Sequence, residues 1–158
     1  MTPEPLRYRF RVGCPAEREF ELWTASAGVW WPMATHSVSG RRDSVLVIEP
    51  GPGGRVYERT ADGQQFSWGV VVAWEPPARL VYEWLVGDTP TEVEVRFAAD
   101  ADGGTVVEIE HRGWERFGEA GGDRRDRNDR GWSGVLPLFA AACGPGSPGP
   151  GERRLTNR

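Results

Sequence analysis

Between Ser44 and His111, six apolar segments follow one another at short intervals, and turn residues separate them. "ADG" (61–63) and "ADGG" (101–104) are hairpin signals, and Pro76-Pro77 ends the longest segment. Within these segments, apolar and charged residues alternate with period two, which is typical of strands with one buried face. The expected strands are 44–49, 55–59, 65–75, 79–86, 91–100 and 105–111. The pattern predicts a six-strand antiparallel meander with short connections.

An antiparallel sheet of this length has an apolar face that another element must cover. A strand at 6–12 and a pair of short helices, the first within 14–24, precede the meander. After the meander, apolar residues recur at helical spacing: Trp132, Val135, Leu136 and Phe139. We therefore predict that a C-terminal helix from about Asp123 to Cys143 covers the sheet. Pro137 is expected to kink this helix or to remove one of its hydrogen bonds.

The composition excludes several functional classes. The chain has 158 residues and a net charge of −4, so nothing in it indicates a nucleic-acid partner. It contains no lysine, which excludes chemistry that needs a lysine Schiff base or a P-loop lysine. No apolar window approaches the length of about 18 residues that a membrane span needs, and the N-terminus lacks a signal sequence. We therefore expect a cytoplasmic protein.

Cys14 and Cys143 lie at opposite ends of the chain and form no C-x-x-C pair. A metal or redox motif is not indicated, and two reduced thiols are expected in the cytosol. Residues 1–144 are long enough for one domain with a core of its own. Residues 145–158 are rich in proline, glycine and charge, which predicts a disordered tail.

Several short sequence segments, together with the order of the elements, resemble those of a known superfamily. These segments are "FELWT" (20–24), "VWWP" (29–32), "GGRVYERTADG" (53–63), "WGVVVAWEPPARLVYEWL" (68–85), "TVVEIEHRGWERFG" (105–118) and "GWSGVLPLF" (131–139). Over about residues 6–143 the chain resembles the helix-grip (START-like, SRPBCC) superfamily, within it the branch named after the activator of heat-shock-protein-90 ATPase. The resemblance implies an α+β fold in which a curved antiparallel sheet wraps around a long C-terminal helix. It also implies an apolar cavity between sheet and helix, without naming a chemistry.

The side chains expected to face this cavity follow from alternation along the strands. Phe66, Trp68, Val70, Val72 and Trp74 share one face by period two, as do Leu80, Tyr82 and Trp84. The predicted ligand-binding residues are Trp31, Glu58, Phe66, Trp68, Tyr82, Trp84, His111, Trp114, Trp132, Leu136 and Phe139. The alternative is that these aromatic rings only fill the core, since each buries roughly 150–250 Å².

Trp30 and Trp31 stand together in "SAGVWWPMATHSV" (26–38). From an extended or loop segment, two neighbouring rings are not expected to point inward together. One ring is therefore predicted in the core, and the other, Trp31, at the entrance of the cavity, where it could also contact a protein partner. His36 follows in a polar loop and is expected at the surface.

His111 and Glu58 are the candidates for polar chemistry. By alternation His111 shares a face with Ile109, and Glu58 shares one with Val56. In the family pattern, the residue at the position of His111 lies near the cavity, and the residue at the position of Glu58 is an acid. A His–Glu pair in a dry pocket could act as general acid or base, or it could be a buried structural bond. We predict no catalytic residue, no cofactor and no metal site.

Three functions remain open at this point. The leading prediction is a non-catalytic bacterial binding domain that holds a small apolar or aromatic ligand. One alternative is a cyclase- or hydrolase-like enzyme that uses Glu58 and His111. The other is a chaperone-associated interaction domain, which an exposed patch around Trp30 and Trp31 would favour. The chain could be a monomer or a homodimer under each of them.

Overall fold

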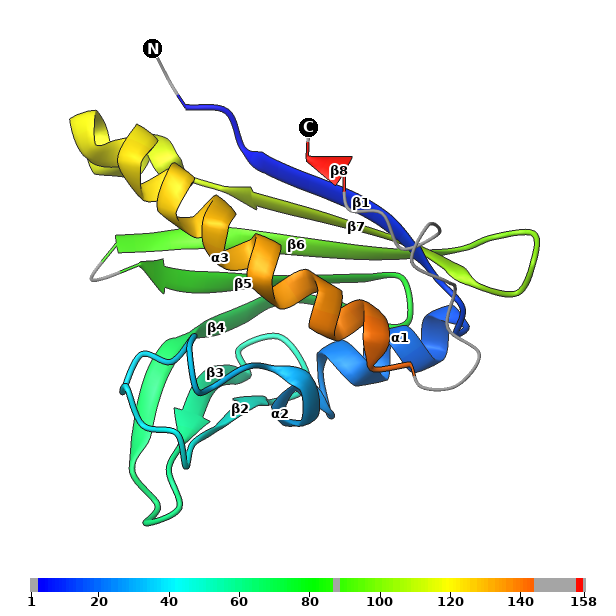
Figure 1. The fold of residues 1–158 in the computed structure, drawn as a ribbon, viewed down its shortest axis with the longest axis horizontal. Coiled ribbons are helices and arrows are strands. Elements are labelled where there is room, and N and C mark those ends of the chain that lie inside the picture. The colour runs from blue at the N-terminus through cyan, green and yellow to red at the C-terminus, as the bar shows by residue number, and fades with distance from the viewer. Residues whose placement is uncertain (1–2, 87–88, 144–155, 158) are drawn as a thin grey trace.

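A computed structural model describes residues 3–86, 89–143 and 156–157 (Figure 1). The elements in chain order are β1 (Leu6–Val12), α1 (Ala16–Trp23), α2 (Ala27–Trp30), β2 (Val45–Ile48), β3 (Arg55–Arg59), β4 (Gln65–Glu75), β5 (Arg79–Val86), β6 (Thr89–Ala99), β7 (Thr105–Arg112), the 3-10 helix η1 (Trp114–Ala120), α3 (Gly121–Ala141) and β8 (Thr156–Asn157).

The strands form one antiparallel sheet in the order β2-β3-β4-β5-β6-β7-β1-β8. Strands β2 to β7 are therefore the predicted meander, and β1 joins it beside β7. Helix α3 crosses one face of this curved sheet, and α1 and α2 lie near its C-terminal end (Figure 1). The α+β helix-grip fold is confirmed. Helix α3 continues through Pro137, which lies on its exposed side, so the proline does not end the helix.

Strand β4 departs from the predicted alternation. Trp68 and Val71 are both buried, whereas Val70 and Val72 are 37% and 48% exposed. The cause is two register irregularities, one in the pairing with β3 near Gly69 and one in the pairing with β5 near Val72. Each such bulge shifts the following side chains to the other face of the sheet. The prediction that Phe66, Trp68, Val70, Val72 and Trp74 share one face is therefore wrong.

Gly69 shows why β4 can approach β5 at this bulge. A Cβ atom on Gly69 would lie 1.8 Å from the backbone oxygen of Glu83, so only glycine fits there. The close approach lets β4 bend and carries Trp68 toward α3, where it joins the core cluster.

The two cysteines are not separate thiols. Cys14 and Cys143 form a disulfide with their Cα atoms 6.0 Å apart, so the expectation of reduced thiols is wrong. Helix α3 returns along the sheet and ends beside the connection between β1 and α1, which brings Cys14 and Cys143 together across a sequence separation of 129 residues (Figure 1). The predicted disordered tail, 145–158, falls outside the described residues except for Thr156 and Asn157, which pair with β1 as β8. Among the described residues, no helix has the length and apolar character needed to cross a membrane.

Candidate functional site, an aromatic cavity under the C-terminal helix

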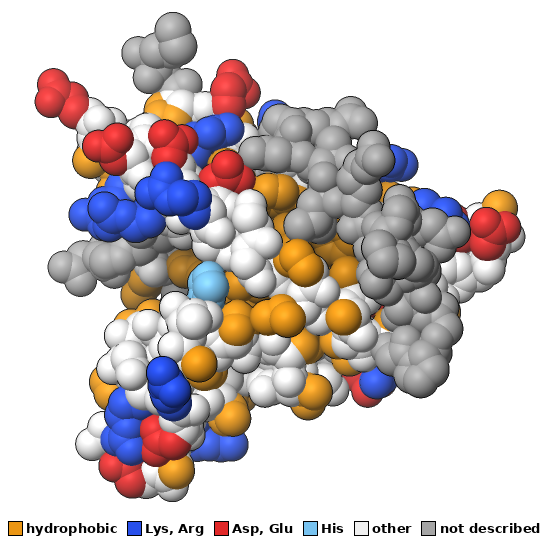
Figure 2. Space-filling model, in the orientation of Figure 1, with side chains coloured by type: hydrophobic (Ala, Val, Ile, Leu, Met, Phe, Trp, Pro, Cys, Tyr) orange, Lys and Arg blue, Asp and Glu red, His pale blue; other side chains and the backbone are white. Residues whose placement is uncertain are grey.

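A cavity of about 200 Å³ lies between the curved sheet, the loop 31–38 and α3. Its lining residues come from these parts of the chain: Trp31, Thr35, His36, Ser37 and Val38 from the loop, Trp68 from β4, Trp84 from β5, and Asn128, Gly131, Trp132 and Val135 from α3. On the face of the molecule that α3 crosses, hydrophobic side chains gather beside the helix, while charged ones surround its N-terminal part (Figure 2).

Four indole rings form the apolar wall of this cavity. Trp31, Trp68 and Trp84 contact one another with ring centroids 5.2–5.5 Å apart, and Trp132 lies 5.3 Å from Trp84. Three of the four N–H groups donate to the protein: Trp31 to the His36 carbonyl, Trp68 to Glu58 and Trp132 to His111. Because these polar groups are already satisfied by the protein, the wall mainly offers aromatic surface.

Glu58 on β3 lies behind this wall and holds two of its parts in place. Its carboxylate accepts five hydrogen bonds, from the Ser37 and Ser39 hydroxyls, the Val38 and Ser39 backbone N–H groups and the Trp68 indole. Burial alone would raise its pKa, but the hydrogen bonds from Ser39, Ser37 and Trp68 outweigh that effect and lower the pKa to about 2. Glu58 is therefore an ionised anchor for the loop and for Trp68.

His111 on β7 is fully buried and lies in a directed chain of hydrogen bonds. The Trp132 indole donates to its Nδ1 atom over 3.0 Å, so its other nitrogen, Nε2, carries the hydrogen in the neutral ring. Nε2 lies 2.7 Å from the Thr91 hydroxyl, which in turn donates to the Trp84 carbonyl. Burial lowers the pKa of His111 to about 3. The ring is therefore neutral, and both of its nitrogens have partners.

The predicted pairing of Glu58 with His111 is not present. The donors to Glu58 include Ser37, Val38, Ser39 and Trp68, whereas the ring nitrogens of His111 contact Thr91 and Trp132. Neither residue lines the cavity. Glu58 accepts a hydrogen bond from Trp68 and His111 accepts one from Trp132, so each of them contacts a tryptophan of the wall from the side away from the cavity.

His36 is half-buried at the surface, where its polar loop was expected to place it, and its ring also lies against α3 and lines the cavity. Its ring lies close to Gly131 and Gly134, where an added Cβ atom would stand 3.5–3.9 Å from it. The two glycines are three residues apart and so share one face of the helix, and their missing side chains make room for the ring. The Thr35 hydroxyl lies 2.7 Å from Nδ1 of His36.

Of the eleven predicted site residues, the structure brings Trp31, Trp68, Trp84 and Trp132 together in the cavity wall. Tyr82, Leu136 and Phe139 are buried in the core beneath it, and Phe66 is half-buried on β4 opposite Glu58. Trp114 stacks on Phe117 and donates to the His111 carbonyl, away from the cavity. The lining residues that the sequence did not reveal are Thr35, His36, Ser37, Val38, Asn128, Gly131 and Val135.

Trp30 and Trp31 are both buried, each 7% exposed, contrary to the expectation that they could not both point inward. The short helix α2 ends at Trp30 and turns the two rings in different directions. Trp30 packs on Trp23 and Phe139 and donates to the Leu22 carbonyl, whereas Trp31 faces the cavity. Trp30 therefore packs in the core and Trp31 lines the cavity, although neither ring is exposed.

Fold and site together define a helix-grip domain with a small cavity walled by tryptophan. Residues 13–143 match the family described as "Activator of Hsp90 ATPase homolog 1-like protein", and the chain belongs to this family. Proteins of this fold family bind ligands or act as polyketide cyclases. None of the curated proteins matches the chain.

Several solved structures are similar. An anthrahydroquino-gama-pyrone synthase, Txn09, complexed with SUM, is 32% identical, with a TM-score of 0.60, and the match covers 88% of this chain and 96% of that one. The self-sacrificing resistance protein CalC from Micromonospora echinospora is 26% identical, with a TM-score of 0.65 and coverage of 87% and 92%. An HSP90 activator from Plasmodium falciparum shares the fold at 16% identity, with a TM-score of 0.64 and coverage of 92% and 99%.

Proposed function

We propose that this protein is a non-catalytic cytoplasmic binding domain that holds a compact, planar aromatic molecule in the tryptophan cavity. The observation that carries the proposal is the wall of four indoles, whose N–H groups on Trp31, Trp68 and Trp132 are turned into the protein. Aromatic surface with three of its four N–H groups already bonded to the protein favours stacking and edge contacts with a flat apolar ligand over recognition of a polar one.

The size of the cavity limits the ligand. Its volume of about 200 Å³ lies below the range of roughly 300–1,000 Å³ that is usual for sites of drug-sized ligands. A ligand of two or three fused rings fits this description better than a long acyl chain does. His36, Ser37 and Asn128 supply the polar edge against which a hydroxyl or carbonyl group of the ligand would lie.

The environment of Glu58 and His111 argues against the enzyme alternative that relied on them. Glu58 is ionised and accepts five hydrogen bonds, and the neutral His111 is buried outside the cavity. Neither can reach a substrate proton without dismantling the wall. Txn09 is named a synthase and CalC a resistance protein, so proteins named for different roles share this fold.

The chaperone-associated alternative relied on an exposed patch at Trp30 and Trp31. Both rings are buried, so that feature is missing. The similarity to the Plasmodium HSP90 activator, at 16% identity, extends to the fold alone.

Filling the cavity from its α3 side tests the proposal. We would titrate 2-naphthol, anthraquinone and, as an acyl-chain comparison, myristate into the wild type and follow tryptophan fluorescence. The test variant is Gly131→Leu, because an added Cβ there makes only an ordinary contact of 3.8 Å with His36 and the longer side chain enters the cavity. The matched control is Gly122→Leu on the same helix, which has open space around it and lies outside the cavity.

We expect saturable quenching by one of the two ring compounds with a Kd on the order of micromolar. Gly131→Leu should weaken that binding at least tenfold, and Gly122→Leu should leave it unchanged. A folded wild type that binds neither ring compound, or a Gly131→Leu variant that binds as tightly as the wild type, would contradict the proposal.

A further inference from the structure

A second buried glutamate lies far along the fold from the cavity. Glu19 on α1 is 0% exposed, and neither oxygen of its carboxyl group has a hydrogen-bond partner among the described residues. Burial raises its pKa to about 8, and the charge of Arg18 offsets this only in part. A buried acid without partners is costly, so its place in the fold needs a physical reason.

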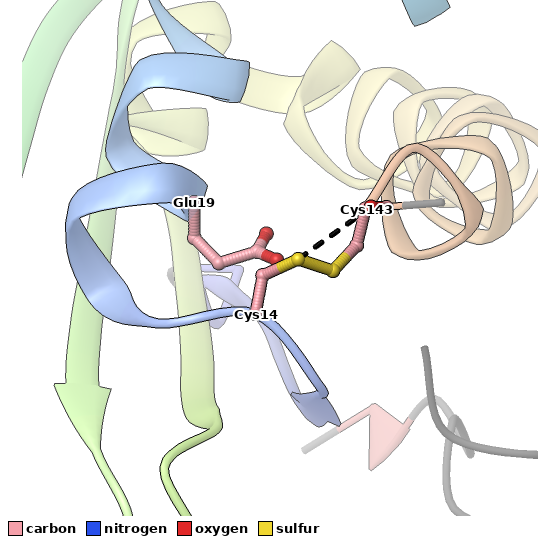
Figure 3. Close-up of side chains that lie close together, drawn as sticks. All are labelled: Cys14, Glu19 and Cys143. Atoms are coloured by element: carbon pink, nitrogen blue, oxygen red, sulfur yellow. Dashed lines mark hydrogen bonds between the residues drawn. A yellow bond between two sulfur atoms is a disulfide. The ribbon is translucent and has the colours of Figure 1, made fainter. Parts of the chain in front are cut away.

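The residues around the carboxyl group of Glu19 supply a physical reason for its burial. Its oxygens point toward the sulfur atoms of Cys14 and Cys143 (Figure 3), and one ligand atom from each of the three residues lies within 4.8 Å of the others. Cys14 precedes α1, Glu19 is one turn into it, and Cys143 follows α3, so three separate positions of the chain converge here.

Two thiolates and a carboxylate are a donor set suited to zinc. In a tetrahedral zinc site with Zn–S bonds of about 2.3 Å, the two sulfurs lie roughly 3.8 Å apart. The Cα atoms of the cysteines are 6.0 Å apart, which leaves their side chains room for this separation once the disulfide is opened. Both cysteines are half-buried, so water can complete the fourth corner.

We propose that Cys14, Glu19 and Cys143, in the dithiol form of the protein, are a binding site for a thiophilic divalent cation such as zinc. A dithiol reductant opens the site: its two S–H groups give two electrons and two protons to the disulfide and become a disulfide themselves, leaving two cysteine thiols. The cation then displaces the thiol protons and the carboxyl proton. The disulfide and the metal complex are thus two alternative states of one site, and in the second the charge of Glu19 is compensated.

Cobalt(II) is the probe for this site, because thiolate-to-cobalt charge-transfer absorption reports directly on bound sulfur. The protein would be reduced with a trialkylphosphine, which takes oxygen from water to become the phosphine oxide and does not compete as a dithiol would. Cobalt would then be titrated anaerobically into reduced and oxidised wild type and into the reduced variants Cys14→Ser, Glu19→Gln and Glu17→Gln. Glu17 is an exposed glutamate of the same helix and serves as the matched control.

We expect the charge-transfer band in the reduced wild type and in Glu17→Gln, its displacement by zinc, and its absence in the oxidised protein and in Cys14→Ser. Glu19→Gln should bind at least tenfold more weakly. A folded reduced wild type without the band, or equal affinity in Glu19→Gln, overturns the proposal.

The comparison of oxidised and reduced wild type decides the question even where a variant does not fold. If reduction alone unfolds the protein, circular dichroism takes over as the measurement. Zinc must then restore the helical signal, and failure to do so counts against the site. The cavity lies elsewhere in the fold, so these outcomes are independent of ligand binding there.

Discussion

Glu58 and Glu19 are both fully buried, yet their surroundings differ in every other respect. Glu58 accepts five hydrogen bonds and its pKa is lowered to about 2. Glu19 accepts none among the described residues and its pKa is raised to about 8. The difference teaches that burial by itself favours the neutral acid, and that only a dense set of donors reverses this preference.

The two residues therefore contribute to the fold in opposite ways at neutral pH. Glu58 is charged and accepts hydrogen bonds from residues 37–39 and from the indole of Trp68. These bonds hold both groups in place against β3. Glu19 is protonated, and its carboxyl oxygens hold no hydrogen-bond partner in place among the described residues. The region around Glu58 should be sensitive to losing its charge, and the region around Glu19 should be sensitive to gaining one.

The largest expected effect is that of Glu58→Gln. The substitution removes the charge that five donors share, and the amide group adds two donors where acceptors are needed. Since a hydrogen bond to a charged group contributes about 1.5–3 kcal/mol, we expect a loss of roughly 3–5 kcal/mol in the free energy of unfolding. Urea denaturation at pH 7 measures it, with the exposed Glu115→Gln as control. A loss below about 1 kcal/mol would show that the loop does not depend on Glu58.

The next effect is a pH dependence caused by Glu19. Its carboxyl group ionises more easily in the unfolded chain than in the folded one, so stability is fully present below the unfolded pKa, about 4.5, and is lost as the pH rises toward 8. A shift of this size costs about 3–4 kcal/mol between pH 5 and pH 8, at roughly 1.4 kcal/mol per pH unit.

The measurement is urea unfolding of the oxidised protein at pH 5, 6, 7 and 8. The wild type and Glu17→Gln should lose stability with rising pH, whereas Glu19→Gln should give a flatter profile. Parallel profiles for all three proteins would mean that Glu19 has a partner in solution and that the contrast with Glu58 is smaller than the structure indicates.

The smallest expected effect comes from removing a single hydrogen bond to Glu58, the one that Trp68 donates. Trp68→Phe keeps an aromatic ring in the wall but removes the N–H group that lies 2.9 Å from the carboxylate. We expect a loss of about 1–2 kcal/mol, clearly less than that of Glu58→Gln, because four donors remain. Trp31→Phe is the comparison, since its N–H group donates to a neutral carbonyl. If both variants lose the same amount, the charge of Glu58 adds nothing to the Trp68 bond.

Most of the fold could be predicted because its signals are local. The strands at 55–59, 65–75 and 79–86 agree with the structure to the residue, since alternation and turn residues mark both of their ends. The bulges in β4 could not be predicted from alternation, because an extra residue leaves the sequence pattern intact while it reverses the faces. Gly69 was the available signal, as an isolated glycine within a strand is typical of a close backbone approach.

The site was less predictable, because it depends on where a loop folds. The tryptophans of β4, β5 and α3 could be found from periodicity, but His36 and Ser37 belong to a loop whose path periodicity does not describe. Gly131 and Gly134 were a usable signal, since two glycines three apart leave a groove on a helix for another group. The disulfide was missed because a separation of 129 residues carries no information until α3 is placed on the sheet.

The two polar-bonded walls of the cavity, helix α3 and the loop 31–38, differ in how many bonds hold them to the rest of the protein. Helix α3 is held along its length, by the bond from Tyr8 to Asp129, the bond from Trp132 to His111 and the disulfide after its end. The loop 31–38 is bonded to the sheet chiefly through Glu58, which accepts from the Ser37 hydroxyl and the Val38 backbone N–H group. The polar attachment of the loop therefore depends on a single carboxylate, whereas that of α3 is spread over three points. Under the proposed function, the residence time of a ligand in the cavity would therefore depend on Glu58, although Glu58 does not line the cavity.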